Sequence, residues 1–360
     1  MRKVVLFLFL GIVISAFSAS TARADAASGD LWYTTFGFPN SIGKVHYSYD
    51  GVSTFTLSGN TVIATPTGAD GILFAPDGNL IVSGQNAQSP PQLHEYTTAG
   101  VFVKDVSAGN SPAGVAPMGS YHMALSGTGP TATLYNMWNG PGTGPTSISA
   151  TVLSGGGLSV GGTNYTVVAG TPGASTDVRG ITLDTVHNVW YYGTAADGST
   201  SGEFGTVSFS GTTATLTRLL TNRPAHGLSF DPFTNTVIMN SGTGIAQFDP
   251  VSGTIIGTIS AAPGNQFDQA AEDGKGHLFV ASNDGNLAFV DYSAVLGGSI
   301  GGPGNFVTLQ FLADTLDDIA PLSGPGSQGN VPEPSTMLLI GSGLLGLWGF
   351  RKKFRKQIDI

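Results

Sequence analysis

The chain has 360 residues, no cysteine and a formal net charge of −9, which excludes disulfides, thiol catalysis and cysteine-ligated zinc or iron–sulfur sites. Residues 25–331 alone hold 21 acidic and six basic residues, a net charge of −15 that argues against nucleic-acid binding. Glycine (53 residues) and proline (20) are abundant although 41% of the residues are hydrophobic, a composition typical of a turn-rich folded protein.

The first 24 residues have the pattern of a secretory signal peptide. Two basic residues precede an apolar stretch over residues 4–17, and Ala22 and Ala24 form a small-residue cleavage site before Asp25. An uncleaved membrane anchor is the alternative interpretation, and the position of the small residues disfavours it. The sequence therefore predicts export of the chain and removal of residues 1–24.

A strand-like motif recurs through the body of the chain. Each copy is a turn residue followed by β-branched and aromatic residues, the composition of a buried strand. The copies are residues 29–34, 78–83, 131–136, 187–192, 234–239 and 276–281. They recur about every 49 residues, with further short strand-like stretches around most of them, which is the period and strand number of propeller blades. Helical periodicity is absent between residues 25 and 330.

Six copies predict an all-β fold, a six-bladed β-propeller over residues 25–322. The first copy has no inner strand before it, and the segment Leu316–Leu322 after the last copy has the composition of that missing strand. Pairing of the two chain ends would close the ring and leave no free edge. The pattern, most closely around Pro76–Leu80, resembles six-bladed propellers of the NHL, streptogramin-lyase and gluconolactonase-like group. Residues 323–331 are the predicted flexible linker behind the ring.

Polar residues recur where the predicted innermost strands begin, at one mouth of the channel. They are Asp70, Tyr121, His122, Arg179, His226, Asp268, Gln269, Asp317 and Asp318. Such a set can bind a divalent cation, with Asp70, His226 and Asp318 as candidate ligands. It can also act as acid and base, with His122, Arg179 and His226 as candidate catalytic residues. The plainer interpretation, which we favour, is that polar strand starts are satisfied by backbone and water.

The resemblance to propeller enzymes implies further candidates. Gluconolactonase-like enzymes hold a metal with an acidic residue, an asparagine and an aspartate, for which Glu272, Asn240 and Asp317 are loose equivalents. Streptogramin lyases depend on inner histidines, and His122 and His226 are the only plausible equivalents. No complete catalytic set can be matched, which favours a binding role over an enzyme. His46 and His94 occupy equivalent places in two blades, which favours a packing role for both.

The last residues combine three features in a fixed order. Pro332, Glu333 and Pro334 precede the apolar run Met337–Phe350. A basic cluster follows, which consists of Arg351, Lys352, Lys353, Arg355 and Lys356. As a helix the run would be about 21 Å long, shorter than a hydrocarbon core of about 30 Å, but flanking residues and snorkelling lysines can extend it. Basic residues favour the cytoplasmic side, so the sequence predicts a transient or permanent single-span anchor with the ring outside.

This ending, residues 332–356, resembles the PEP-CTERM sorting signal of Gram-negative bacteria. The resemblance implies an exosortase-type membrane protease as a partner, an inner-membrane intermediate, and a final place at the cell surface or outside the cell. It also implies a binding or structural protein of the surface or matrix, with exopolysaccharide as the expected ligand class. A metal-dependent lactonase or lyase is the alternative.

Overall fold

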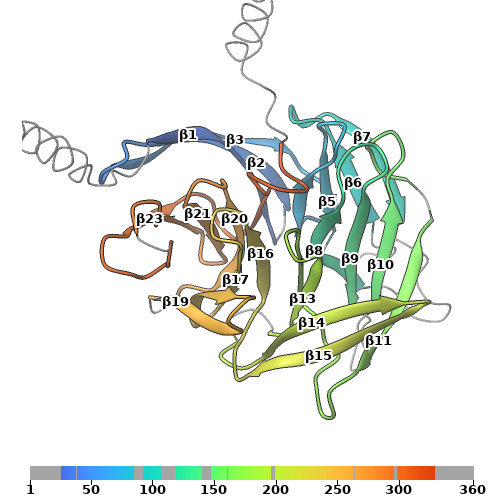
Figure 1. Ribbon diagram of the computed structural model, residues 1–360. Helices are drawn as coiled ribbons and strands as arrows, with labels where there is room; N and C mark the ends of the chain where they lie inside the picture. The colour runs from blue at the N-terminus through green and yellow to red at the C-terminus, as the bar shows by residue number, and fades with distance from the viewer. Residues whose placement is uncertain are drawn as a thin grey trace, which may run out of the picture.

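The computed structural model describes residues 26–37, 39–84, 92–107, 118–139, 147–159, 161–195, 199–262, 264–295 and 298–328. All regular secondary structure in this part of the chain is β-strand, as 24 strands arranged around a common centre (Figure 1). Within the described ranges, no helix is long and apolar enough to cross a membrane. The predicted signal peptide and the predicted C-terminal anchor lie outside the described residues.

The strands form six blades of four. Listed from the innermost strand outwards, the first three blades are β24 (Leu316–Ile319), β1 (Ala27–Thr35), β2 (Ser41–Tyr49) and β3 (Phe55–Ala64); β4 (Ile72–Phe74), β5 (Leu80–Ser83), β6 (Gln92–Tyr96) and β7 (Phe102–Ser107); and β8 (Met118–Ser126), β9 (Thr133–Asn139), β10 (Ser147–Val152) and β11 (Thr163–Ala169). The other three are β12 (Gly180–Asp184), β13 (Val189–Gly193), β14 (Glu203–Ser210) and β15 (Thr213–Thr221); β16 (Gly227–Asp231), β17 (Thr236–Ser241), β18 (Gly244–Asp249) and β19 (Thr254–Ser260); and β20 (Phe267–Glu272), β21 (His277–Ser282), β22 (Asn286–Asp291) and β23 (Phe306–Phe311). The repeated motif is the second strand of every blade, so the prediction of six blades is confirmed.

Blade 1 is built from both ends of the described chain. Strand β24 pairs antiparallel with β1, with Ile319 opposite Tyr33 and Leu316 opposite Thr35, and the register shifts between these two pairs. In Figure 1 the C-terminal strand lies beside the blue N-terminal strands. Leu316 and Ile319 are fully buried. The predicted closure of the ring by the segment after the sixth blade is therefore confirmed.

Turns at the end of the innermost strands explain why the repeat is visible in the sequence. Asp77, Asp184, Asp231 and Asp273 each accept a hydrogen bond from the backbone N–H two residues later. The following strand is entered through a residue with positive φ, which is Gly78, Asn188, Asn235 or Gly276. An aspartate followed by glycine or asparagine suits such a turn, because the carboxylate satisfies the backbone and glycine and asparagine tolerate positive φ.

The core is divided among the six interfaces between neighbouring blades. Each interface has its own cluster of buried apolar side chains. Between blades 6 and 1, for example, Phe55 stacks on Phe289 at a centroid distance of 4.3 Å, and Phe279 lies against Tyr47 at 4.6 Å. Each such side chain contributes about 1.5–3 kcal/mol by its burial, which holds the ring together without disulfides.

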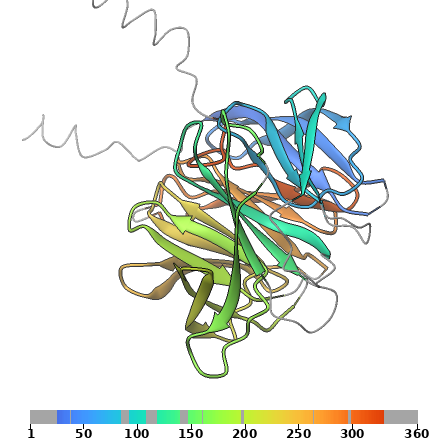
Figure 2. The same ribbon diagram turned by 90° about the vertical axis from the view of Figure 1, so that its right-hand side faces the viewer.

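The outer edges of blades 3 and 4 pair with each other. Strand β11 runs parallel to β15, from Thr166 opposite Thr213 to Ala169 opposite Leu216, so the two blades form one eight-stranded sheet. Figure 2 shows these green and yellow-green strands from the side. The pairing removes two free edges that other chains could otherwise join. The sequence does not predict it.

The segment after β24 lies against the ring. The hydroxyl of Ser323 donates to the carbonyl of Glu272 (2.7 Å), and the carbonyl of Gly326 accepts from the N–H of Phe74 (2.6 Å). Residues 323–328, the first part of the predicted linker, are thus attached to the ends of the innermost strands. The remaining residues of that linker lie outside the described part of the chain.

Candidate functional site

Polar side chains from several blades meet at the mouth of the channel where the innermost strands begin. His122 lies on β8, His226 immediately precedes β16, Asp268 lies on β20 and Asp318 lies on β24. None of the four is more than 4% exposed. Because each lies on an innermost strand or directly before one, residues far apart in the sequence converge near one axis. The sequence also predicts Tyr121 at this mouth, but its side chain is not among those that the structure describes.

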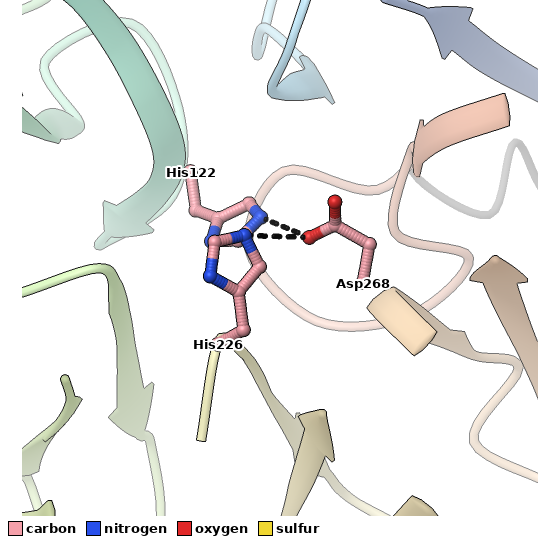
Figure 3. Close-up of side chains that lie close together, drawn as sticks. All are labelled: His122, His226 and Asp268. Carbon is pink, nitrogen blue, oxygen red and sulfur yellow. Dashed lines mark hydrogen bonds and ion pairs between the residues drawn. The ribbon is translucent and has the colours of Figure 1, made fainter. Parts of the chain in front are cut away.

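The two histidines contact the same carboxylate oxygen. Oδ1 of Asp268 lies 2.8 Å from Nε2 of His122 and 3.1 Å from Nε2 of His226. In Figure 3 dashed lines join both rings to this one oxygen, and the ring centroids are 4.9 Å apart at an interplanar angle of 76°. Nε2 of His122 also lies 3.2 Å from Oδ1 of Asp318.

Backbone carbonyls orient both rings. Nδ1 of His122 lies 3.1 Å from the carbonyl oxygen of Arg179, and Nδ1 of His226 lies 2.8 Å from that of Ala195. A carbonyl oxygen can only accept a hydrogen bond, so each Nδ1 carries a hydrogen and donates it. The Nε2 atoms are thereby directed toward the carboxylates.

Three more carboxylates surround the histidines. The carbonyl of Asp70 accepts a hydrogen bond from the hydroxyl of Thr34, and the same hydroxyl accepts from the N–H of Asp318, 3.1 Å away. Thr34 therefore joins the starts of β4 and β24. Oδ2 of Asp317 is buried and has no hydrogen-bond partner among the described residues.

The charges in this cluster are strongly coupled. Burial alone would raise the pKa of Asp268, but the charges and hydrogen bonds of His226 and His122 outweigh it and hold that pKa well below its usual range. Burial alone would lower the pKa of His122, but Asp318 and Asp268 raise it well above its usual value. Burial and the neighbouring carboxylates raise the pKa of Asp317 well above its usual range. Burial also raises the pKa of Asp318, against the opposing effect of His122.

The residues named from the sequence as catalytic candidates are placed differently from one another. His122 and His226 lie together. The guanidinium of Arg179, by contrast, pairs with Asp177 (3.0 Å), and Arg179 contacts His122 through its backbone carbonyl. Glu272, one of the residues suggested by the resemblance to gluconolactonase-like enzymes, is the last residue of β20, whereas Asp268 is its second. Four residues of strand at about 3.3 Å each separate the two by about 13 Å. Glu272 therefore belongs to the opposite end of the channel. Asn240 is fully buried, and neither of its side-chain polar atoms has a hydrogen-bond partner among the described residues.

Two overlapping triads have ligand atoms close enough to hold an ion. They are His122, His226 and Asp268, and Asp70, His122 and Asp318, each with its ligand atoms within 4.8 Å of one another. The sequence places Asp268 at the mouth, but its position alone does not distinguish it as the carboxylate that both histidines share. The carbonyls of Arg179 and Ala195 have no side-chain signature, so the sequence offers no signal for them.

The other histidines compared from the sequence pair with aspartates of adjacent strands. Nδ1 of His46 lies 2.9 Å from Asp30, and Nδ1 of His94 lies 2.5 Å from Asp105. Each contact joins two neighbouring strands of one blade. His94 is buried, as a packing role requires, whereas the side chain of His46 is 51% exposed and does not fit that prediction.

The opposite end of the channel is covered by the segment after β24. A cavity of about 70 Å³ lies there, lined among others by Ser229, Glu272 and Ser323. Beside it, a groove of about 470 Å³ runs between the turn at Asp77, the turn at Thr128 and residues 324–328. The buried carboxyl of Glu272 bonds to the hydroxyl of Ser229, and burial, with the charge of Asp231, raises its pKa to about 8.

Comparison with solved structures finds similar chains at low sequence identity. A chain from the crystal structure of a nidogen/laminin complex is 14% identical, with 82% of this chain and 98% of that chain covered and a TM-score of 0.52. A protein of unknown function from Bacteroides caccae is 13% identical (83% and 100% covered, TM-score 0.49). A protein named as a candidate gluconolactonase is 12% identical (71% and 88% covered, TM-score 0.45). No curated protein matches the sequence.

One sequence family matches the end of the chain. The PEP-CTERM protein-sorting motif matches residues 330–356, which include Pro332, Glu333, Pro334 and the basic cluster. This motif marks proteins that are exported to the cell envelope or surface and that an exosortase, a membrane protease, recognises. The chain is therefore a six-bladed β-propeller that ends in a PEP-CTERM protein-sorting motif.

Proposed function

We propose that this protein is a binding protein of the cell surface or extracellular matrix, with exopolysaccharide as its ligand class. The sorting motif at residues 330–356 is the observation that carries the proposal, because it directs the ring to the place where such polymers are deposited. The strongly acidic body keeps the exported ring soluble.

The burial of the channel cluster favours binding over catalysis. His122, His226 and Asp268 are at most 4% exposed, so a substrate would have to displace protein atoms to reach them. Catalytic sites are normally concave and open to the substrate. The groove at the other end of the channel is larger, and its volume of about 470 Å³ is within the usual range of ligand sites, roughly 300–1,000 Å³.

This groove has the features of a ligand site. Asp77 and Thr128 are exposed along it, and Phe74 contributes an apolar wall. Residues 324–328 form one side, so a ligand in the groove would lie next to the sorting tail.

Filling the groove tests the proposal. Thr128→Trp, in an exposed turn beside two glycines, should reduce co-sedimentation of the purified protein with exopolysaccharide from the same cells by at least tenfold. Thr212→Trp is the matched control, since Thr212 is exposed in the turn between β14 and β15. Equal binding by both variants would argue against the groove, and no binding by the unchanged protein would argue against the polysaccharide ligand.

A metal-dependent lactonase or lyase is the second candidate, and the convergence of His122 and His226 on Asp268 is the observation in its favour. It predicts turnover of lactones or uronate polymers that depends on an added divalent ion and that His226→Gln abolishes. The binding proposal predicts no turnover above buffer under the same conditions.

A further inference from the structure

Two buried imidazoles direct their Nε2 atoms at one carboxylate oxygen of Asp268 (Figure 3). Because the carbonyls of Arg179 and Ala195 fix the hydrogen on Nδ1, each neutral ring would present the lone pair of Nε2. Oδ1 of Asp268, 2.8 and 3.1 Å from the two Nε2 atoms, presents lone pairs as well. A positive species must therefore lie among these three atoms, either as a proton on each ring or as a bound cation.

We propose that this species is one divalent transition-metal ion bound by His122, His226 and Asp268, whose ligand atoms lie within 4.8 Å of one another. Two ligands of an ion with bonds of about 2.1 Å lie about 3.0 Å apart in octahedral and about 3.4 Å apart in tetrahedral geometry. The contacts of 2.8 and 3.1 Å need to open by only a few tenths of an ångström. Donation of Nδ1–H to a backbone carbonyl is also the usual arrangement for a metal-bound histidine.

The carboxylates at this mouth suit a dication. The mouth holds more carboxylates than histidines, and Oδ2 of the buried Asp317 has no hydrogen-bond partner among the described residues. A dication neutralises this acidic surplus and leaves both imidazoles neutral.

The donor atoms and their burial indicate the kind of site. Two imidazole nitrogens with carboxylate oxygens suit Zn²⁺ and the neighbouring metals from Fe²⁺ to Cu²⁺. Closed burial of every ligand is typical of a structural site, since a catalytic site keeps a position open. The three ligands come from blades 3, 5 and 6, so the ion would tie together opposite sides of the ring. This role is independent of the proposed polysaccharide binding.

Zinc titration of the full-length chain, stripped with a chelator, tests the site. We expect one Zn²⁺ per chain by elemental analysis and a thermal midpoint that rises with Zn²⁺ and falls again with chelator. His122→Gln and Asp268→Asn should each reduce Zn²⁺ affinity at least tenfold. His187→Gln is the matched control, because it removes a histidine–aspartate pair (2.6 Å to Asp184) outside the channel, and it should bind like the unchanged chain.

Cobalt replaces zinc as a second probe if the variants fail to fold. The unchanged chain loaded with Co²⁺ should show visible absorption bands of a nitrogen- and oxygen-ligated ion, and one equivalent of Zn²⁺ should remove them. The inference is overturned if the stripped chain takes up neither ion, or if His122→Gln and His187→Gln bind Zn²⁺ equally well. It is also overturned if chelator leaves the thermal midpoint of a metal-loaded chain unchanged.

Discussion

Replacement of Glu272 by glutamine should make the ring less sensitive to alkaline pH. The Glu272 carboxyl is 4% exposed at the end of β20 and bonds to the hydroxyl of Ser229. Burial and the nearby charge of Asp231 raise its pKa from 4.5 to about 8. Glutamine has nearly the same shape and can keep the bond to Ser229, but it has no charge to bury.

The sign of the effect follows from proton binding. Between pH 4.5 and about 8 the folded protein holds a proton on Glu272 that the unfolded chain has lost, so stability falls as pH rises through this range. The slope is at most about 1.4 kcal/mol per pH unit, and the loss between pH 5 and pH 8 is about 3 kcal/mol. Below the lower pKa the contribution is fully present.

The measurement is urea unfolding of both proteins, followed by tryptophan fluorescence, at several pH values from 5 to 8. Asp231, Asp273 and Tyr292 face Glu272 and are present in both proteins, so the difference between the two curves isolates Glu272. The difference should grow by about 3 kcal/mol in favour of glutamine toward pH 8. Asp314→Asn, at an exposed aspartate, is the control and should follow the unchanged protein. Parallel curves for Glu272→Gln and the unchanged protein would refute the reasoning.

Two further predictions concern the packing of the ring. Leu316→Ala should cost about 2–5 kcal/mol of unfolding free energy, because Leu316 is fully buried where β24 closes the ring. The control, Val307→Ala at an exposed position of β23, should cost less than about 0.5 kcal/mol. Similar losses for both variants in urea unfolding would argue against closure of the ring by β24. Gly43→Ala should lower the free energy of unfolding by about 1–3 kcal/mol, because the added Cβ would lie 2.0 Å from Cζ of Tyr33. An unchanged thermal midpoint would contradict this prediction, because it would mean that the buried ring of Tyr33 can move aside without cost.

The blades are predictable because local chemistry repeats. Aspartate and a residue tolerant of positive φ, as at Asp77 and Gly78, close the same hairpin in blade after blade and leave a period in the sequence. The missing inner strand of the first copy points to β24. The parallel pairing of β11 with β15 is not predictable, since β11 consists mainly of exposed and half-buried residues, like the outer strands β19 and β23 that have no such partner among the described residues.

The candidate site is predictable in position but not in detail. The strand repeat predicts that His122, His226 and Asp268 lie at one mouth of the channel. That both rings share one oxygen depends on ring orientation, which the carbonyls of Arg179 and Ala195 determine, and backbone carbonyls carry no sequence signal. For the same reason Arg179 is named from the sequence for its guanidinium but contacts the cluster through its backbone.

The most direct test of the account is the location and mass of the protein recovered from fractionated cells. The account predicts a chain that begins at Asp25 in the envelope or surface fraction, and retention in the inner membrane when Pro332, Glu333 and Pro334 are replaced by alanine. A cytosolic chain that still carries Met1–Ala24 and the intact C-terminal peptide would contradict it.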